Sequence, residues 1–116
     1  MNFQELEEEI DPFYLSEYDG SYSVCLNTGD YKNEIFEARY EEGFLGNGYD
    51  WQSLAVVFIN EKMPELEEKI EFDSEAGLFC AYSNDKSVME QFAIAFKTAC
   101  EDDVLIKDLF SRAELD

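Results

Sequence analysis

Gly46-Asn47-Gly48-Tyr49-Asp50-Trp51 opens the stretch that decides the fold, because it joins a glycine-containing loop to a helical pattern that runs to about Lys62. Apolar residues follow at helical spacing and form one stripe: Trp51, Leu54, Ala55, Phe58 and Ile59. Gly46 and Gly48 can take positive φ at little cost, and Asp50 can accept hydrogen bonds from amides of the first turn. We predict a loop that ends in a capped helix with a buried stripe.

Two large aromatic residues, Tyr49 and Trp51, lie on either side of the predicted cap. We expect one ring to point into the core and the other to stay near the surface, where it could anchor a partner. The alternative is that both rings only pack the loop onto the core. Tyr49 is our candidate anchor.

Strand patterns lie on both sides of this helix. Residues 13–18 and 21–26 flank the turn dipeptide Asp19-Gly20, which predicts a hairpin, and residues 34–40 alternate as a third strand. After Pro64 closes the helix, residues 69–73 and 78–82 alternate around a glycine-containing turn and predict an antiparallel pair.

Helical patterns fill the rest of the chain. A capping box at Ser87 and Glu90 predicts a long core helix to about Cys100, and the acidic residues 101–103 cap a new helix near Val104. Residues 1–11 form an acidic lead in which Phe3, Leu6 and Ile10 suit a short docking helix. We therefore predict a single α+β domain over residues 1–116, with a mainly antiparallel twisted sheet of about five strands and helices packed on one face.

The charge is the most unusual total. The 116 residues include 28 acidic and 8 basic side chains and no histidine, which gives a formal net charge of -20. Such a field repels nucleic acid and anionic membranes and attracts cationic partners. The alternative is that the acidity serves solubility alone.

Catalytic and metal-binding machinery is hard to assemble from these residues. The absence of histidine excludes the usual catalytic triads and histidine-centred zinc sites. Asp73 and Glu75 could act as a carboxylate pair, but they bracket an exposed hairpin turn. Phosphate-binding glycine motifs and calcium-loop spacing are missing. We expect a protein that is not an enzyme and needs no cofactor.

The cysteines and the amino-terminal residues bear on the compartment. Cys25, Cys80 and Cys100 are odd in number and lack metal-binding spacing, so we expect them to be reduced and buried. The first residues show neither the basic region nor the apolar run of a secretory signal. We therefore expect cytoplasmic residence.

A binding surface is the best functional hypothesis from the residues alone. Carboxylates crowd the predicted third strand and the loop after it, and with one aromatic they make up the candidate contacts: Glu34, Glu37, Glu41, Glu42, Tyr49 and Asp50. Charge would supply speed of association and the aromatic ring would supply anchoring energy. The alternative is an ordinary solvated acidic edge.

Two segments resemble a known family. Residues 43–51 (Gly-Phe-Leu-Gly-Asn-Gly-Tyr-Asp-Trp), the following Ser53-Leu54-Ala55, and residues 70–83 (Ile-Glu-Phe-Asp-Ser-Glu-Ala-Gly-Leu-Phe-Cys-Ala-Tyr-Ser) resemble the immunity protein 51 family of bacterial polymorphic toxin systems. The resemblance covers about residues 20 to 112. Its motif residues here are Gly46, Gly48, Tyr49, Asp50, Trp51, Asp73, Glu75 and Phe79.

The resemblance implies a small cytosolic protein that binds and neutralises a cognate toxin domain, often a nuclease with a basic cleft. It does not say which motif residues are contacts and which are scaffold. Two other functions share the charge argument: an acidic regulator that mimics DNA and binds a nucleic-acid-binding protein, and a small acidic binding module with a pocket beside Trp51.

Overall fold

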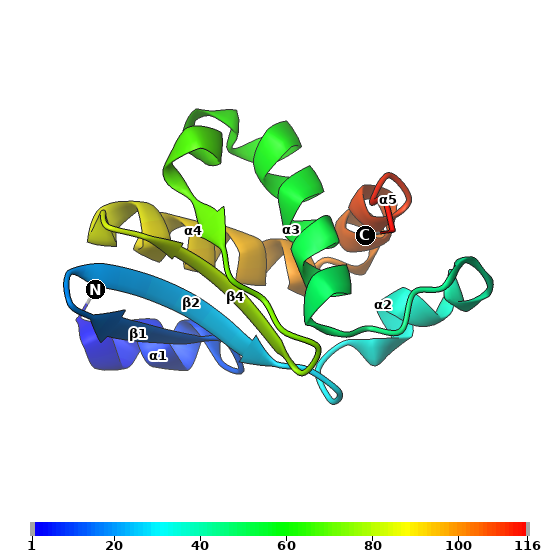
Figure 1. The fold of residues 1–116 in the computed structure, drawn as a ribbon, viewed down its shortest axis with the longest axis horizontal. Coiled ribbons are helices and arrows are strands. Elements are labelled where there is room, and N and C mark those ends of the chain that lie inside the picture. The colour runs from blue at the N-terminus through cyan, green and yellow to red at the C-terminus, as the bar shows by residue number, and fades with distance from the viewer. Residues whose placement is uncertain (1, 116) are drawn as a thin grey trace.

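A four-stranded sheet organises the computed structural model, which describes residues 2–115 (Figure 1). The elements follow in the order α1 (Phe3–Ile10), β1 (Tyr14–Tyr18), β2 (Ser21–Asn27), α2 (Asn33–Glu37), the 3-10 helix η1 (Tyr40–Glu42), α3 (Gly48–Lys62), the 3-10 helix η2 (Pro64–Lys69), β3 (Glu71–Phe72), β4 (Leu78–Ser83), α4 (Lys86–Glu101) and α5 (Asp103–Phe110). The side chain of Phe3, expected to help dock α1, lies outside the described residues. Leu6 and Ile10 of that helix are buried.

The sheet has the order β1-β2-β4-β3, and every neighbouring pair is antiparallel. Both predicted hairpins, β1 with β2 and β3 with β4, are confirmed. At the first turn Asp19 and Gly20 have φ of 51° and 80°, the left-handed values that a tight hairpin turn needs.

The predicted third strand at residues 34–40 is wrong, so the sheet has four strands instead of about five. The chain there forms α2 and η1. Ile35 and Phe36 are adjacent and both buried, whereas neighbours in a strand point to opposite faces. Phe36 packs against Phe110, with ring centroids 5.0 Å apart, and this packing overrides the strand preference of its neighbours.

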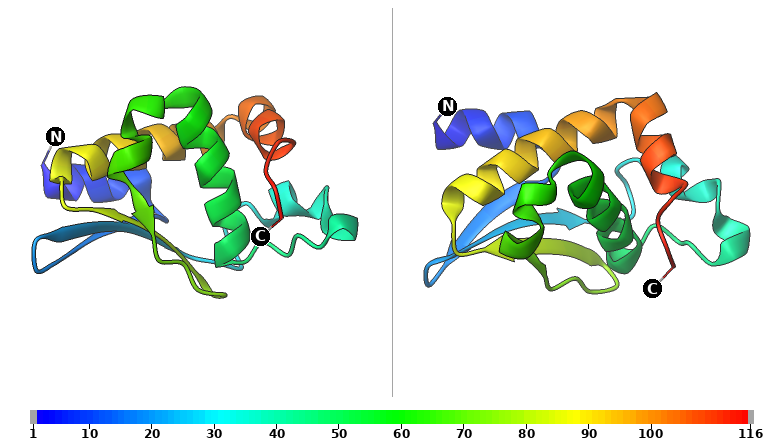
Figure 2. Two further views of the ribbon diagram at one scale, coloured as in Figure 1. Left: turned by 45° about the horizontal axis from the view of Figure 1, so that its top comes forward. Right: turned by 90° about the horizontal axis from the view of Figure 1, so that it is seen from above.

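The helices lie on one face of the sheet, as predicted. The left panel of Figure 2 shows the strands on one side and α1, α3, α4 and α5 on the other. Side chains alternate accordingly, so that Val24 and Phe79 enter the core while Tyr14 and Tyr82 point away from the helices. Among the described residues no helix covers this second face.

The helix ends follow their caps. α3 ends at Lys62, two residues before Pro64. Asp102 caps α5 by accepting a hydrogen bond from the Leu105 amide at 3.1 Å, so the break near residue 102 is confirmed. The cap of α4 is Asp85 and not the expected Ser87. Within residues 2–115 no helix is both long and apolar enough to cross a membrane.

Candidate partner-binding surface

The start of α3 packs directly on the turn between β3 and β4. The Gly48 amide donates a hydrogen bond to the Ala76 carbonyl oxygen at 3.0 Å. A methyl group on Gly48 would lie 1.9 Å from the carbonyl oxygen of Glu75 and 2.3 Å from that of Leu78. The two segments that carry the family resemblance therefore meet at backbone contact, and only glycine fits at their junction.

The cap of α3 differs from the prediction. Asn47 caps the helix, because its side-chain oxygen accepts a hydrogen bond from the Asp50 amide at 2.9 Å. The Asp50 carboxylate turns back instead and accepts hydrogen bonds from the amides of Leu45 and Gly46, at 2.6 Å and 2.9 Å. With 3% of its surface exposed, Asp50 supports the loop from beneath.

Trp51 is the aromatic residue that points inward. Its ring is fully buried, stacks on Tyr31 with centroids 6.0 Å apart, and contacts Phe36 at 5.1 Å. The indole N–H has no hydrogen-bond partner among the described residues, and the ring is surrounded by the aromatic rings of the core. Phe79 is buried in the same core, whereas Asp73 and Glu75 leave their carboxylates exposed at the hairpin turn.

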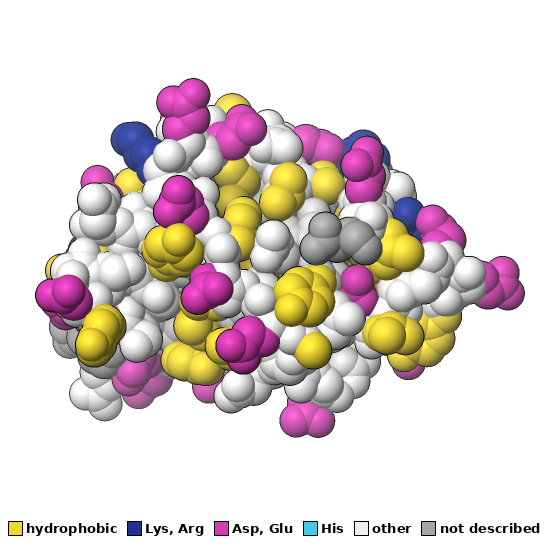
Figure 3. Space-filling model, in the orientation of Figure 1, with side chains coloured by type: hydrophobic (Ala, Val, Ile, Leu, Met, Phe, Trp, Pro, Cys, Tyr) yellow, Lys and Arg dark blue, Asp and Glu magenta, His cyan; other side chains and the backbone are white. Residues whose placement is uncertain are grey.

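Four exposed apolar side chains belong to the segment that leads into α3 and to the carboxyl-terminal residues packed on it. We call Tyr40, Leu45, Tyr49 and Leu115 the anchor cluster; 51%, 71%, 41% and 48% of their respective surfaces are exposed. Tyr49 and Leu115 line one hollow of about 290 Å³ together with Gly43. Figure 3 shows apolar side chains gathered over the loop that leads into α3 and near the carboxyl terminus, with carboxylates around them. An exposed apolar group of this kind is typical of a protein-binding surface.

Exposed carboxylates precede the loop of the anchor cluster along the chain. Glu34, Glu37 and Glu41 are exposed on α2 and η1. Glu42 differs, because the Arg39 guanidinium donates two hydrogen bonds to its carboxylate at 2.7 Å each and holds the pKa of Glu42 below its usual range. We call Glu34, Glu37 and Glu41 the acidic rim.

Arg39 has a structural role in the segment that carries the acidic rim. Its guanidinium also donates hydrogen bonds to the carbonyl oxygens of Phe110 and Ala113, both at 2.7 Å, and stacks over the Phe44 ring at 4.5 Å. The segment that carries the acidic rim is thereby fastened to the end of α5 and the residues after it. The anchor cluster therefore lies on a supported surface.

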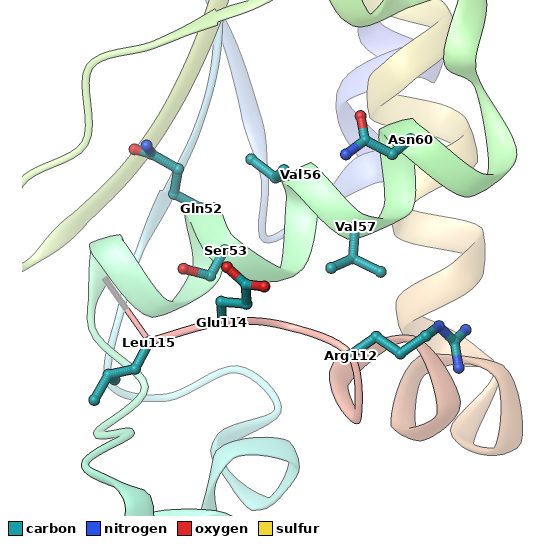
Figure 4. Close-up of a pocket in the computed structure, with 8 residues that line it drawn as sticks. All are labelled: Gln52, Ser53, Val56, Val57, Asn60, Arg112, Glu114 and Leu115. Atoms are coloured by element: carbon teal, nitrogen blue, oxygen red, sulfur yellow. The ribbon is translucent and has the colours of Figure 1, made fainter.

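A groove of about 410 Å³ adjoins the anchor cluster between α3 and the carboxyl-terminal segment (Figure 4). Val56 and Val57 contribute apolar surface, Glu114 points toward Ser53, and Leu115 joins the groove to the anchor cluster. Arg112 also lines the groove, and its guanidinium pairs with the Glu61 carboxylate at 2.6 Å.

The sequence alone does not predict that Tyr40 and Leu115 belong to this surface. The sequence pattern predicts a strand at Tyr40, and Leu115 lies in a segment with no periodic pattern. In the sequence, only Leu45 indicates an exposed apolar residue here, because it lies in a loop between Gly43 and Gly46. No group of three or more His, Cys, Asp or Glu side chains within residues 2–115 is arranged to hold a metal ion.

The model of the family described as immunity protein 51 matches residues 13–115. The match begins after α1 and contains all four strands, both resembling segments and the anchor cluster. The resemblance seen in the sequence is thereby confirmed. Comparison with curated proteins and with solved structures finds no match.

Proposed function

The chain belongs to the immunity protein 51 family, and on that premise we propose that it binds a basic toxin domain and neutralises it without catalysis of its own. Membership implies an immunity protein with a toxin as partner. We further propose that this toxin is basic and is a nuclease.

One observation carries the proposal: residues 34–49 present both exposed apolar side chains and exposed carboxylates, and Arg39 fastens this segment to the end of α5. Tyr49 and Leu45 offer large contact area, and burial of such side chains at the centre of an interface supplies most of its binding energy. Glu37 and Glu41, exposed on the same segment of the chain, would raise the rate of encounter with a cationic partner.

The overall charge supports a basic partner. The chain carries 28 acidic and 8 basic residues. Lys32, Arg39 and Arg112 are already paired with carboxylates of this chain. A nuclease cleft that holds nucleic acid is lined by cations, so an acidic protein can occupy it.

The first experiment identifies the partner. Tagged protein is used to capture binders from its own cells, the column is eluted in a salt gradient, and the eluted proteins are identified by mass spectrometry. We expect a basic toxin domain that is released only at high salt, because screening weakens charge attraction. A chromosomal nucleic-acid-binding protein would overturn the proposal in favour of a DNA mimic.

The second experiment tests neutralisation. The captured domain is expressed in a host that it poisons, and the immunity protein is expressed beside it. Growth should be restored by the wild-type chain and lost with the double variant Leu45→Ala, Tyr49→Ala. Tyr18→Ala is the matched control, since Tyr18 is an exposed tyrosine at the β1–β2 hairpin. Failure of the wild-type chain to restore growth would refute the proposal.

A further inference from the structure

Two of the three cysteines are paired across the sheet. Cys25 of β2 and Cys80 of β4 are register partners, and the Cys25 thiol donates a hydrogen bond to the Cys80 sulfur with 3.6 Å between the sulfur atoms. Both lie on the sheet face that points away from the helices, beside Tyr14. Contrary to the expectation that all three are buried, Cys80 is partly exposed, whereas Cys25 and Cys100 are buried.

The backbone around this pair suits a disulfide. The Cys80 amide donates its hydrogen bond to the Ser74 hydroxyl oxygen at 3.1 Å instead of to β2, and the Cys80 carbonyl oxygen accepts one from the Asp73 amide at 3.0 Å. Both groups point away from Cys25, so the two cysteines form a non-hydrogen-bonded pair. Such pairs have Cα atoms about 4.5 Å apart, within the ~4.4–6.8 Å that a disulfide spans.

We propose that Cys25 and Cys80 form a redox-active dithiol that closes to a cross-strand disulfide when it meets a low-molecular-weight disulfide such as oxidised glutathione. The Cys80 thiolate attacks one glutathione sulfur, forms a mixed disulfide and releases one glutathione thiolate. Cys25 then gives its proton to solvent, and its sulfur attacks the Cys80 sulfur and releases the second glutathione. The two cysteines lose two electrons and two protons, and glutathione disulfide is reduced to two thiols.

The order of attack follows from the surroundings of each sulfur. Hydrogen bonds from the Cys25 thiol and the Ser23 hydroxyl lower the pKa of Cys80 to about 7, against the effect of burial. The pKa of Cys25 is raised, first by its bond to Cys80 and then by burial. Cys80 is therefore both the more accessible thiol and the better attacking one, and Cys25 is the resolving thiol.

The inference stands apart from the proposed function and is tested on the free chain, without a partner. Reduced protein is incubated with oxidised glutathione, its remaining thiols are alkylated, and intact mass and peptide mass are measured. We expect monomeric protein that has lost two hydrogen atoms, with Cys25 joined to Cys80 and Cys100 alkylated. The disulfide links residues 55 apart in sequence, so the oxidised chain should also melt at a higher temperature.

Single variants separate the steps. Cys25→Ser should stop at a stable glutathione adduct on Cys80, Cys80→Ser should react slowly at Cys25, and Cys100→Ser should behave as the wild type. A wild-type chain that keeps the adduct, forms intermolecular dimers or couples Cys100 would overturn the proposal. So would a folded chain that stays reduced under conditions where the unfolded chain is oxidised.

Discussion

Two sets of residues are interleaved along residues 40–51, and they differ in what they face. Gly46, Gly48, Asp50 and Trp51 face the protein, and each has a defined internal contact. Tyr40, Leu45 and Tyr49 face solvent. The recognisable motif is therefore mainly scaffold, and the residues available to a partner are interleaved with it.

This difference is physical. A scaffold position here tolerates few side chains, because a methyl group at Gly48 would overlap two carbonyl oxygens and a buried Asp50 satisfies two amides. The exposed set meets no such requirement within the chain. Exposed leucine and tyrosine bury only part of their surface on folding, and a contiguous group of them is typical of a protein-binding surface.

The largest effect should come from Gly48→Ala. The added methyl group cannot coexist with the Glu75 carbonyl oxygen at 1.9 Å, so α3 must move off the β3–β4 turn. We expect the free energy of unfolding to fall by more than about 4 kcal/mol, measured by urea denaturation. Gly77→Ala is the control, because its methyl group would meet nothing within 4 Å. Equal stability of the two variants would mean that Gly48 does not set this junction.

Asp50→Ala should have the next largest effect on stability. It leaves the amides of Leu45 and Gly46 without their acceptor, which should cost about 3 kcal/mol in the free energy of unfolding. Asp50→Asn keeps one acceptor oxygen and should cost about half as much. Hydrogen exchange of the two amides measures the cause directly, and unchanged exchange in Asp50→Ala would contradict it.

Periodic patterns allowed much of the fold to be predicted. The stripe of α3, both hairpins and the break at Asp102 each follow from local spacing. The helix at Ile35 and Phe36 does not follow from local spacing. Two adjacent apolar residues fit either a strand or a helix, and packing on Phe110 decides between them. The cap was ambiguous for a similar reason, since Asn47 and Asp50 are both good capping residues.

The candidate surface was predicted less well because it depends on contacts between distant segments. Leu115 packs against Gly43, where an added methyl group would lie 2.9 Å from the leucine side chain. No local pattern joins these residues. The Cys25–Cys80 pair is similar, since strand order alone brings β2 beside β4. Periodicity assigns a residue to a face, whereas topology determines its neighbour on that face.

Tyr49→Ala should separate binding from folding. Because the Tyr49 side chain is already partly exposed, we expect the free energy of unfolding to change by less than about 1 kcal/mol. Affinity for the captured toxin domain should fall by about 2 kcal/mol, roughly 30-fold, if the ring is an anchor. Calorimetry of the complex and urea denaturation of the free chain give the two numbers, and Tyr18→Ala should change neither. A loss of stability that matches the loss of affinity would place Tyr49 with the scaffold.

The smallest effect, and the one that separates local from overall charge, should come from reversing the acidic rim. The double variant Glu37→Lys, Glu41→Lys is a better test than one that includes Glu42. Glu42 already forms an ion pair with Arg39, and reversing its charge would disturb the scaffold. Stability should stay within about 0.5 kcal/mol, since these side chains are exposed.

Association with the toxin domain should slow several-fold at low salt and little at high salt, as stopped-flow mixing can measure. Glu7→Lys with Glu8→Lys on α1 makes the same change in net charge far along the chain from the anchor cluster. Because the two double variants alter the overall charge equally, any difference in their rates belongs to the rim itself. Equal slowing by both pairs would instead assign the steering to the field of the whole molecule and leave the anchor cluster as the only local determinant of binding.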